Sequence, residues 1–190
     1  MTNDLIKILA DAELAWYIQK ASALRSIPRK VGGNNFRHVL YSFNIMLDYE
    51  IFDVIALKAA IIHDVLEDVP NFVSDKEILN IDEDGKKVLE LVRALTFHKD
   101  KETKSEYLTR LLEENNPQCL KIKICDRIAN LIEINTDIYS EAKIEKKLME
   151  TEDYILPMAE KIKNQEMVRE IKDLISSRRE FIRIRKTEKT

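Results

Sequence analysis

Residues 59–68 combine an apolar run with four side chains that can bind a metal ion or move a proton. His63 and Asp64 are neighbours, and Glu67 and Asp68 follow them by four residues each. Residues four apart lie on the same side of a helix, so the two pairs are expected to share one broad face. Three carboxylates beside an imidazole repel one another, and burying them is costly unless a cation lies among them. The cluster therefore predicts a divalent-metal site.

Three further residues are unusual for their surroundings. His38 lies near the start of an expected helix, and Asp126 lies in an apolar segment with Asn130 four residues later. A single histidine is more often a core residue, and Asp126 beside Arg127 is more often a surface ion pair. The chain has only three histidines, however, and two of them fit a metal-ligand set. The predicted ligands are His38, His63, Asp64 and Asp126.

This ligand set comes from three expected helices and offers two nitrogens and two carboxylates. Mixed imidazole and carboxylate ligands suit Mn²⁺, Fe²⁺ or Zn²⁺, and Mn²⁺ is the expected ion if positions stay open for water and substrate. Such an ion lowers the pKa of a bound water and polarises a phosphoryl oxygen.

The elements that must position these residues are predicted to be helices. Apolar residues recur at three- and four-residue steps over 4–24, 36–48, 53–68, 84–95, 105–115 and 117–134. Two charged amphipathic helices are expected over 140–163 and 165–183, and Pro157 is expected to kink or divide the first. With three Gly and four Pro, the chain has little material for an all-β fold. We predict one all-α domain over 1–190, with about eight to ten helices, a motif-bearing core over about 26–157 and C-terminal helices over about 140–190.

The charge and the hydrophobic pattern of the chain indicate which kinds of partner are expected. The net charge of -3 argues against a dedicated nucleic-acid binder, and the basic end over 178–189 is interpreted as a solvated helix end. Cys119 and Cys125 are expected to be small buried residues. The N-terminus has no signal-peptide pattern, and no apolar run approaches the ~18 residues of a membrane span, so a cytoplasmic protein without a membrane partner is expected. The C-terminal helices are expected to buttress the core or to form the surface of a homo-oligomer.

The order His38, His63-Asp64, Asp126 resembles that of the HD-domain metal-dependent phosphohydrolases. The chain is similar in particular to the hydrolase domain of RelA/SpoT-type alarmone enzymes. That branch carries His-Asp-x-x-Glu-Asp, found here at 63–68, and Lys-x-x-Asp-Arg-x-x-Asn, found here at 123–130. It also places Arg-Lys-x-Gly nine residues before the first histidine, as residues 29–32 do here. The resemblance covers about residues 29–157.

The resemblance implies an HD-domain fold and hydrolysis of the 3′-pyrophosphate of ppGpp or pppGpp at a Mn²⁺ site, with a small-molecule nucleotide as the partner. It implies that Glu67 and Asp68 orient or deprotonate the attacking water. Arg29 and Lys30 would lie beside the nucleotide, and Asn130 would hydrogen-bond its sugar or phosphate side. A stand-alone hydrolase is expected, since no room remains for a synthetase domain.

The chain departs from the family pattern at several positions: Val31, Val69, Ala129, Glu133 and the segment 33–36. An acidic Glu133 would disfavour a polyanion at close range. Two alternatives therefore stay open, hydrolysis of another nucleotide (a nucleoside monophosphate or NADPH) and a non-catalytic nucleotide-binding module. His98 is expected at the surface, and Tyr107, Arg110 and residues 99–101 are open candidates for the border of the pocket.

Overall fold

The computed structural model describes residues 2–134 and 138–188, and the side chains of residues 7–134 and 138–187. Regular structure in these ranges is helical, and the β structure described there is one isolated bridge between Pro28 and Asn34. The predicted all-α class is confirmed. The helices are α1 (Thr2–Asp11), α2 (Ala15–Ala21), α3 (Asn35–Asp48), α4 (Val54–Ile62), α5 (Val65–Asp68), α6 (Asp75–Leu79), α7 (Gly85–Leu95), α8 (Lys104–Glu114), α9 (Pro117–Ile132), α10 (Glu141–Glu150), α11 (Leu156–Lys161) and α12 (Gln165–Glu188), with the 3₁₀ segment η1 (Ser22–Ser26) and the π-helical segment η2 (Thr151–Ile155).

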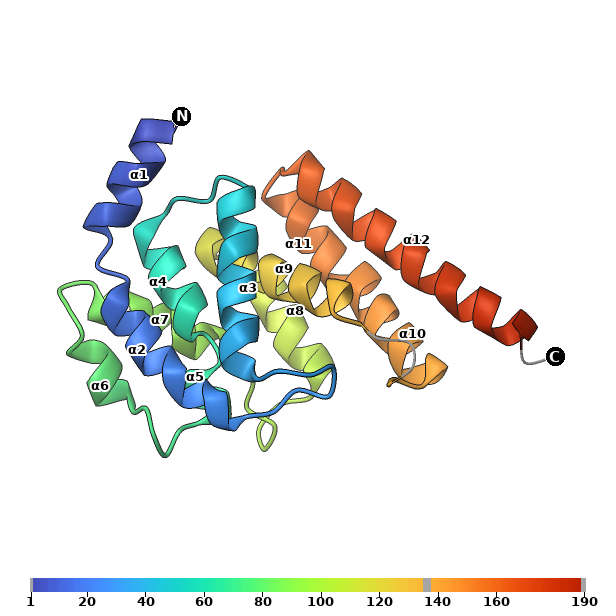
Figure 1. Ribbon diagram of the computed structural model, residues 1–190, viewed down its shortest axis with the longest axis horizontal. Coiled ribbons are helices and arrows are strands. Elements are labelled where there is room, and N and C mark those ends of the chain that lie inside the picture. Colours follow the sequence, from blue (N-terminus) through green and yellow to red (C-terminus); the bar gives the residue numbers. More distant parts are fainter. Residues whose placement is uncertain (1, 135–137, 189–190) are drawn as a thin grey trace.

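Helices α3, α4 and α9 form the centre of the molecule (Figure 1). In α4, every residue from Ala56 to Ile62 is buried, and all of them except the ion-paired Lys58 are apolar, as expected of a core helix. Helix α9 begins with the Asn116 cap and Pro117 in its first turn, and most of its residues are buried between α3, α4, α7, α11 and α12. The three helices expected to supply the metal ligands therefore pack against one another.

Two expected helices are divided. The pattern over 4–24 breaks near Glu13, which has a left-handed backbone (φ 47), so α1 and α2 are separate. The stretch 53–68 is also interrupted, because α4 ends at Ile62 and α5 begins at Val65. His63 caps the end of α4 and Asp64 precedes α5, so the four predicted side chains extend from a turn and a short helix.

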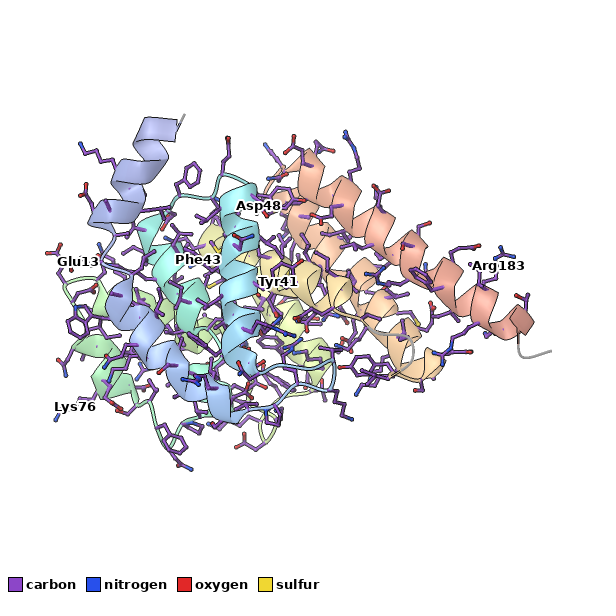
Figure 2. The ribbon with its side chains drawn as sticks, in the orientation of Figure 1. Glu13, Tyr41, Phe43, Asp48, Lys76 and Arg183 are labelled. Atoms are coloured by element: carbon purple, nitrogen blue, oxygen red, sulfur yellow. The ribbon has the colours of Figure 1, made fainter. Side chains whose placement is uncertain are left out.

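The C-terminal part of the chain packs on the opposite side of α9 from α7 (Figure 1). Pro157 divides this region as predicted, since it lies in the first turn of α11 directly after the π-helical segment η2. Helix α12 is a single long helix along the outer edge. Figure 2 shows Arg183 on its outer part, Lys76 at the far edge of the molecule, and Tyr41 and Phe43 on opposite sides of α3.

The basic end of the chain is more firmly attached than predicted. Arg178 donates to the backbone carbonyls of Leu131 and Ile132, and Arg179 pairs with Glu145 and Glu152. Lys189, the last residue of the predicted basic run, lies outside the described residues. Both cysteines are free and buried, as expected. Among the described helices, none is long and apolar enough to cross a membrane.

Candidate metal centre and its pocket

His63 presents a buried nitrogen with no hydrogen-bond partner. Its Nδ1 lies 2.7 Å from the carbonyl oxygen of Ala60, so Nδ1 carries the proton and donates it to that oxygen. Its Nε2 is buried without a hydrogen-bond partner and lies 3.2 Å from Oδ1 of Asp64. Buried polar atoms in proteins normally have a partner. A cation bound by both atoms would supply one.

His38 and Asp126 face this position from α3 and α9. Nε2 of His38 lies 2.9 Å from Oδ1 of Asp126, and the same oxygen lies 4.0 Å from Nε2 of His63. One ligand atom each from His38, His63 and Asp64 lies within 4.8 Å of the other two. These separations fit donors that surround one ion at bond lengths of about 2.0–2.2 Å. The donor set of the four residues thus matches the chemistry of a divalent transition-metal ion.

The charges around His38 and Asp126 are strongly perturbed. Burial opposes a charged His38, but the hydrogen bonds to Asp126 and Glu133 outweigh it and raise the pKa of His38 to about 9. Burial alone would raise the pKa of Asp126, yet the Lys123 ammonium, 2.7 Å from Oδ2, and His38 hold that pKa well below its usual range. Asp126 is therefore an ionised carboxylate, held by positive charge on both oxygens.

Glu67 and Asp68 extend the acidic wall from α5. Burial, together with the negative charges of Asp64 and Glu67, raises the pKa of Asp68 to about 6. Asn35 donates its side-chain amide to Oδ2 of Asp64 (3.2 Å) and to Oδ2 of Asp68. The carboxylate of Glu67 lies 3.1 Å from Nζ of Lys99. These two carboxylates thus lie beside the ligand cluster, where they can accept a proton from a water molecule.

Arg29 is placed by a tight turn. Gly32 and Gly33 have positive φ angles of 92° and 70°, and the amide of Arg29 donates to the carbonyl of Gly33. The turn returns the chain to Asn35, whose Oδ1 accepts from Nη1 of Arg29 at 3.0 Å. Nη2 of Arg29 donates to Oδ1 of Asn130 and to Oε2 of Glu133. The guanidinium is thus held at the edge of the site from α3 and α9.

A cavity of about 540 Å³ opens beside the ligand cluster and contains most of the predicted residues. Its lining is also rich in cations. The cations that line it are Arg29, Lys99, Lys104, Lys123, Arg127, Lys143, Lys146 and Lys147, contributed by five segments of the chain. Carboxylates and cations therefore lie close together in the cavity, and some are paired, as Lys123 is with Asp126 and Lys99 with Glu67.

Lys104 and Lys147 line the cavity, are half-buried, and form no ion pair with a described residue. Nζ of Lys104 lies over the rings of Phe97 and Tyr107, at 4.7 and 4.6 Å from their centroids. Lys147 lies on α10 and is half-buried. Burial is the main cause that lowers the pKa of each lysine to about 8. An anion in the cavity would relieve this cost of burial, so both lysines are suited to bind one.

Arg127 on α9 binds the end of α10, the helix that carries three of the cavity lysines. Its guanidinium donates to the backbone carbonyl of Lys147, to Oγ1 of Thr151 and to Glu150. Thr151 begins the π-helical segment, and its own hydroxyl also donates to the carbonyl of Lys147. The lysines of α10 are consequently oriented from a residue next to Asp126.

The structure brings together nearly all of the predicted site residues. His38, Asp64, Asp126, Glu67, Asp68, Arg29 and Asn130 line the cavity, and His63 lies directly behind it. Lys30 is exposed and does not line it. Of the open candidates, Lys99 lines the cavity, while Tyr107 is buried against Leu95 and Arg110 binds Glu102 and the carbonyl of Ala94. His98 is exposed, as expected.

Sequence reasoning missed Asn35, Lys104 and Lys147 and did not foresee the contacts of Glu133 with His38 and Arg29. Asn35 lies three residues before His38, so helical spacing could have placed it on the same side of α3. Lys147 is four residues after Lys143, which indicates one basic face. Spacing alone, however, does not show that these sides of α3 and α10 are turned toward the cavity.

No protein-family model matches the chain, and no curated protein sequence matches it. A solved structure does, reported as a metazoan ortholog of SpoT that hydrolyses ppGpp and plays a role in starvation responses. The two share 21% sequence identity with a TM-score of 0.70, and the match covers 87% of this chain and 94% of that chain. The expected fold is therefore confirmed over most of the chain.

Proposed function

We propose that this chain is a divalent-metal-dependent phosphohydrolase that removes the 3′-pyrophosphate of ppGpp or pppGpp, giving GDP or GTP and pyrophosphate. One observation supports it most directly. A ligand cluster with a buried, unpartnered nitrogen lies beside a cavity that is also lined by lysines. Such a cavity suits a substrate with phosphate groups both at the metal and away from it. The solved structure of similar fold is described as hydrolysing ppGpp.

His38, His63, Asp64 and Asp126 would hold the metal ion, which we propose to be Mn²⁺. When bound, the ion supplies a more acidic water and polarises the phosphoryl oxygen. The ligands are one wall of the cavity, so an ion held there remains open to water and substrate on the cavity side.

Glu67 and Asp68 would orient the attacking water and take its proton. A general base works best when its pKa lies near the working pH, and the pKa of Asp68 is about 6. The water oxygen bonds to the phosphorus next to the ribose 3′-oxygen, the bond between that phosphorus and the 3′-oxygen breaks, and the 3′-oxygen is protonated. Asn35 would keep Asp68 in place through its amide.

Lys104 and Lys147 would bind phosphate oxygens in the cavity. Asn130 would fix the sugar or phosphate side of the nucleotide, and Arg29 would border the base. Lys30 is exposed, so we assign its role to the outer edge of the nucleotide site. As a hydrolase of a free nucleotide, the protein is proposed to act in the cytoplasm.

A second candidate is hydrolysis of another nucleotide, a nucleoside monophosphate or NADPH. The observation that favours it is the ion pair of Arg29 with Glu133 at 2.9 Å, which neutralises a cation beside the ligands. Neutralisation lowers the attraction for a polyanion at that edge.

The test is release of phosphate and pyrophosphate from ppGpp by protein purified with Mn²⁺, beside His63→Ala and Asp64→Ala variants. NADPH and nucleoside monophosphates are assayed in parallel. GDP and pyrophosphate from ppGpp, lost in both variants, is the expected result. Phosphate from another nucleotide alone would favour the second candidate. Metal binding without turnover of any substrate would leave a non-catalytic nucleotide-binding module.

A further inference from the structure

Glu133 binds a metal-ligand candidate and a nucleotide-side cation with one oxygen atom. It lies directly after the last residue of α9, and its side chain is 13% exposed. Its Oε2 lies 3.1 Å from Nδ1 of His38 and 2.9 Å from Nη2 of Arg29. Both partners of this oxygen are nitrogen donors, an imidazole and a guanidinium, so Oε2 accepts from the two at once.

The contact to Glu133 fixes which edge of the His38 ring faces the ligand cluster. Nδ1 of His38 binds Glu133, and Nε2 faces Asp126. An ion at the cluster would take the place of the Nε2 proton. A carboxylate behind a metal-binding imidazole fixes the ring orientation and makes the other nitrogen a stronger donor to the ion. Nδ1 of His63 is held by the Ala60 carbonyl, a neutral partner.

The contact to Arg29 completes a set of hydrogen bonds that uses both ends of the guanidinium fork. Nη1 donates to Asn35, and Nη2 donates to Asn130 and Glu133. The third nitrogen, Nε, is buried without a partner. Arg29 is thus fixed in orientation and neutralised in charge. Its flat face can border a ligand, while phosphate binding depends on the lysines of the cavity.

We infer that Glu133 is a positioning residue that couples the metal centre to the nucleotide side of the site, through His38 and Arg29. The inference rests on the proposed function for the identity of the ligands. Loss of the contact would disturb both sides at once. The acidic residue at this position then has a positioning role, in addition to the sequence-based expectation that it disfavours a polyanion at close range.

Three substitutions distinguish the effect of the hydrogen bonds of Glu133 from the effect of its negative charge. Glu133→Gln retains an oxygen at the position that accepts from His38 and Arg29 but removes the charge. Glu133→Asp retains the charge but withdraws it from both donors by one methylene. Glu133→Leu removes both. Glu150→Gln is the matched control, because Glu150 lines the same cavity and binds Arg127 but not His38.

The first readout is Mn²⁺ affinity by calorimetry without nucleotide, and the second is KM and kcat for the hydrolysed nucleotide. Glu133→Leu and Glu133→Asp are expected to weaken Mn²⁺ binding by about ten- to hundredfold and to raise KM. Glu133→Gln is expected to lose much less affinity, and Glu150→Gln none. Thermal unfolding of the metal-free variants identifies any that fail to fold. If one of the three Glu133 variants is unfolded, the Mn²⁺ affinities of the other two test the inference.

Two results would overturn the inference. One is Mn²⁺ affinity of Glu133→Leu equal to that of the unmodified protein. The other is Glu133→Asp behaving as the unmodified protein while Glu133→Gln and Glu150→Gln both lose affinity, which would mean that charge alone matters. If Mn²⁺ affinity depends on Glu133 as expected but no nucleotide is hydrolysed, the proposed function is overturned. The positioning of His38 by Glu133 is then still supported. Absence of Mn²⁺ binding would overturn both.

Discussion

Nε2 of His38 lies 2.9 Å from Oδ1 of Asp126, although the two residues are 88 positions apart in the chain. The distance is set by the packing of α3 directly against α9. It brings together two ligand candidates that are far apart in the sequence, with His63 and Asp64 beside them. Binding of an ion at this point would therefore connect helices that are distant in sequence.

Mn²⁺ is expected to stabilise the protein against heat. At one hundred times its Kd, an ion that binds only the folded state adds about 2.7 kcal/mol, or roughly 5–10 °C in Tm for a chain of this size. His63→Ala and Asp64→Ala should abolish the shift, as measured by differential scanning fluorimetry. His98→Ala is the matched control, because His98 is exposed and lies outside the cavity. Equal shifts in all variants would place the ion elsewhere.

The affinity for an anionic nucleotide is expected to fall as pH rises through about 8. The folded-state pKa of Lys104 and Lys147 is lowered to about 8, so both lose their positive charge in that range, well below the usual pH for a lysine. KM should therefore rise between pH 7 and pH 9.

Lys104→Met should raise KM at pH 7 by about tenfold or more, since a hydrogen bond to a charged group contributes about 1.5–3 kcal/mol. It should also flatten the pH dependence. Lys86→Met, at an exposed position on α7, is the control. A KM profile that is flat in the unmodified protein would contradict the role of these lysines.

Asn35→Ala is expected to lower kcat about ten- to hundredfold, the usual cost of removing a residue that orients groups around a metal site. The amide donates to Asp64 and Asp68, so its loss frees two neighbouring carboxylates that repel each other. Steady-state kinetics with saturating Mn²⁺ measure the effect. Asn44→Ala, on the exposed side of the same helix, should retain full activity. Equal kcat for both variants would refute the assignment.

Lys58→Met is expected to destabilise the fold by about 3–5 kcal/mol, because it leaves buried carboxylates without their cation. Nζ of Lys58 lies 2.7 Å from Asp82 and 2.8 Å from Asp84, and its side chain is 5% exposed. Urea unfolding measures the loss. Lys20→Met, which breaks a more exposed pair with Glu77, should cost only about 0–1 kcal/mol. Similar costs for the two substitutions would mean that Lys58 is not effectively buried.

The fold class was predictable because most helices are amphipathic or wholly apolar, and both patterns follow from the spacing of apolar residues. The metal-ligand candidates were predictable from residue type, since imidazole and carboxylate in an apolar segment have few other uses. The break between α4 and α5 was not predictable, because no Gly or Pro marks it. The turn at His63-Asp64 follows from packing, which propensity alone does not describe.

The cavity lysines and the contacts of Glu133 could not be predicted, because both depend on tertiary packing. Lys104 and Lys147 reach the cavity because α8 and α10 pack against the α9 region, and charged helices of this kind are normally solvated. Glu133 was expected to disfavour a polyanion because of its charge. Its partners, His38 and Arg29, are about one hundred residues away in sequence and could not be recognised from spacing. The assigned roles of Glu67, Asp68, Arg29, Lys30 and Asn130 remain predictions.

The ligand candidates and the three cavity lysines of α10 lie on different helices. The proposed metal centre lies on α3, α5, α9 and the turn after α4, all anchored in the core. Lys143, Lys146 and Lys147 lie on one side of α10, joined to the centre by Arg127. Substitutions along that side of α10 can alter which substrate is accepted while the chemistry is preserved. The protein is thus a favourable starting point for directed evolution of substrate preference.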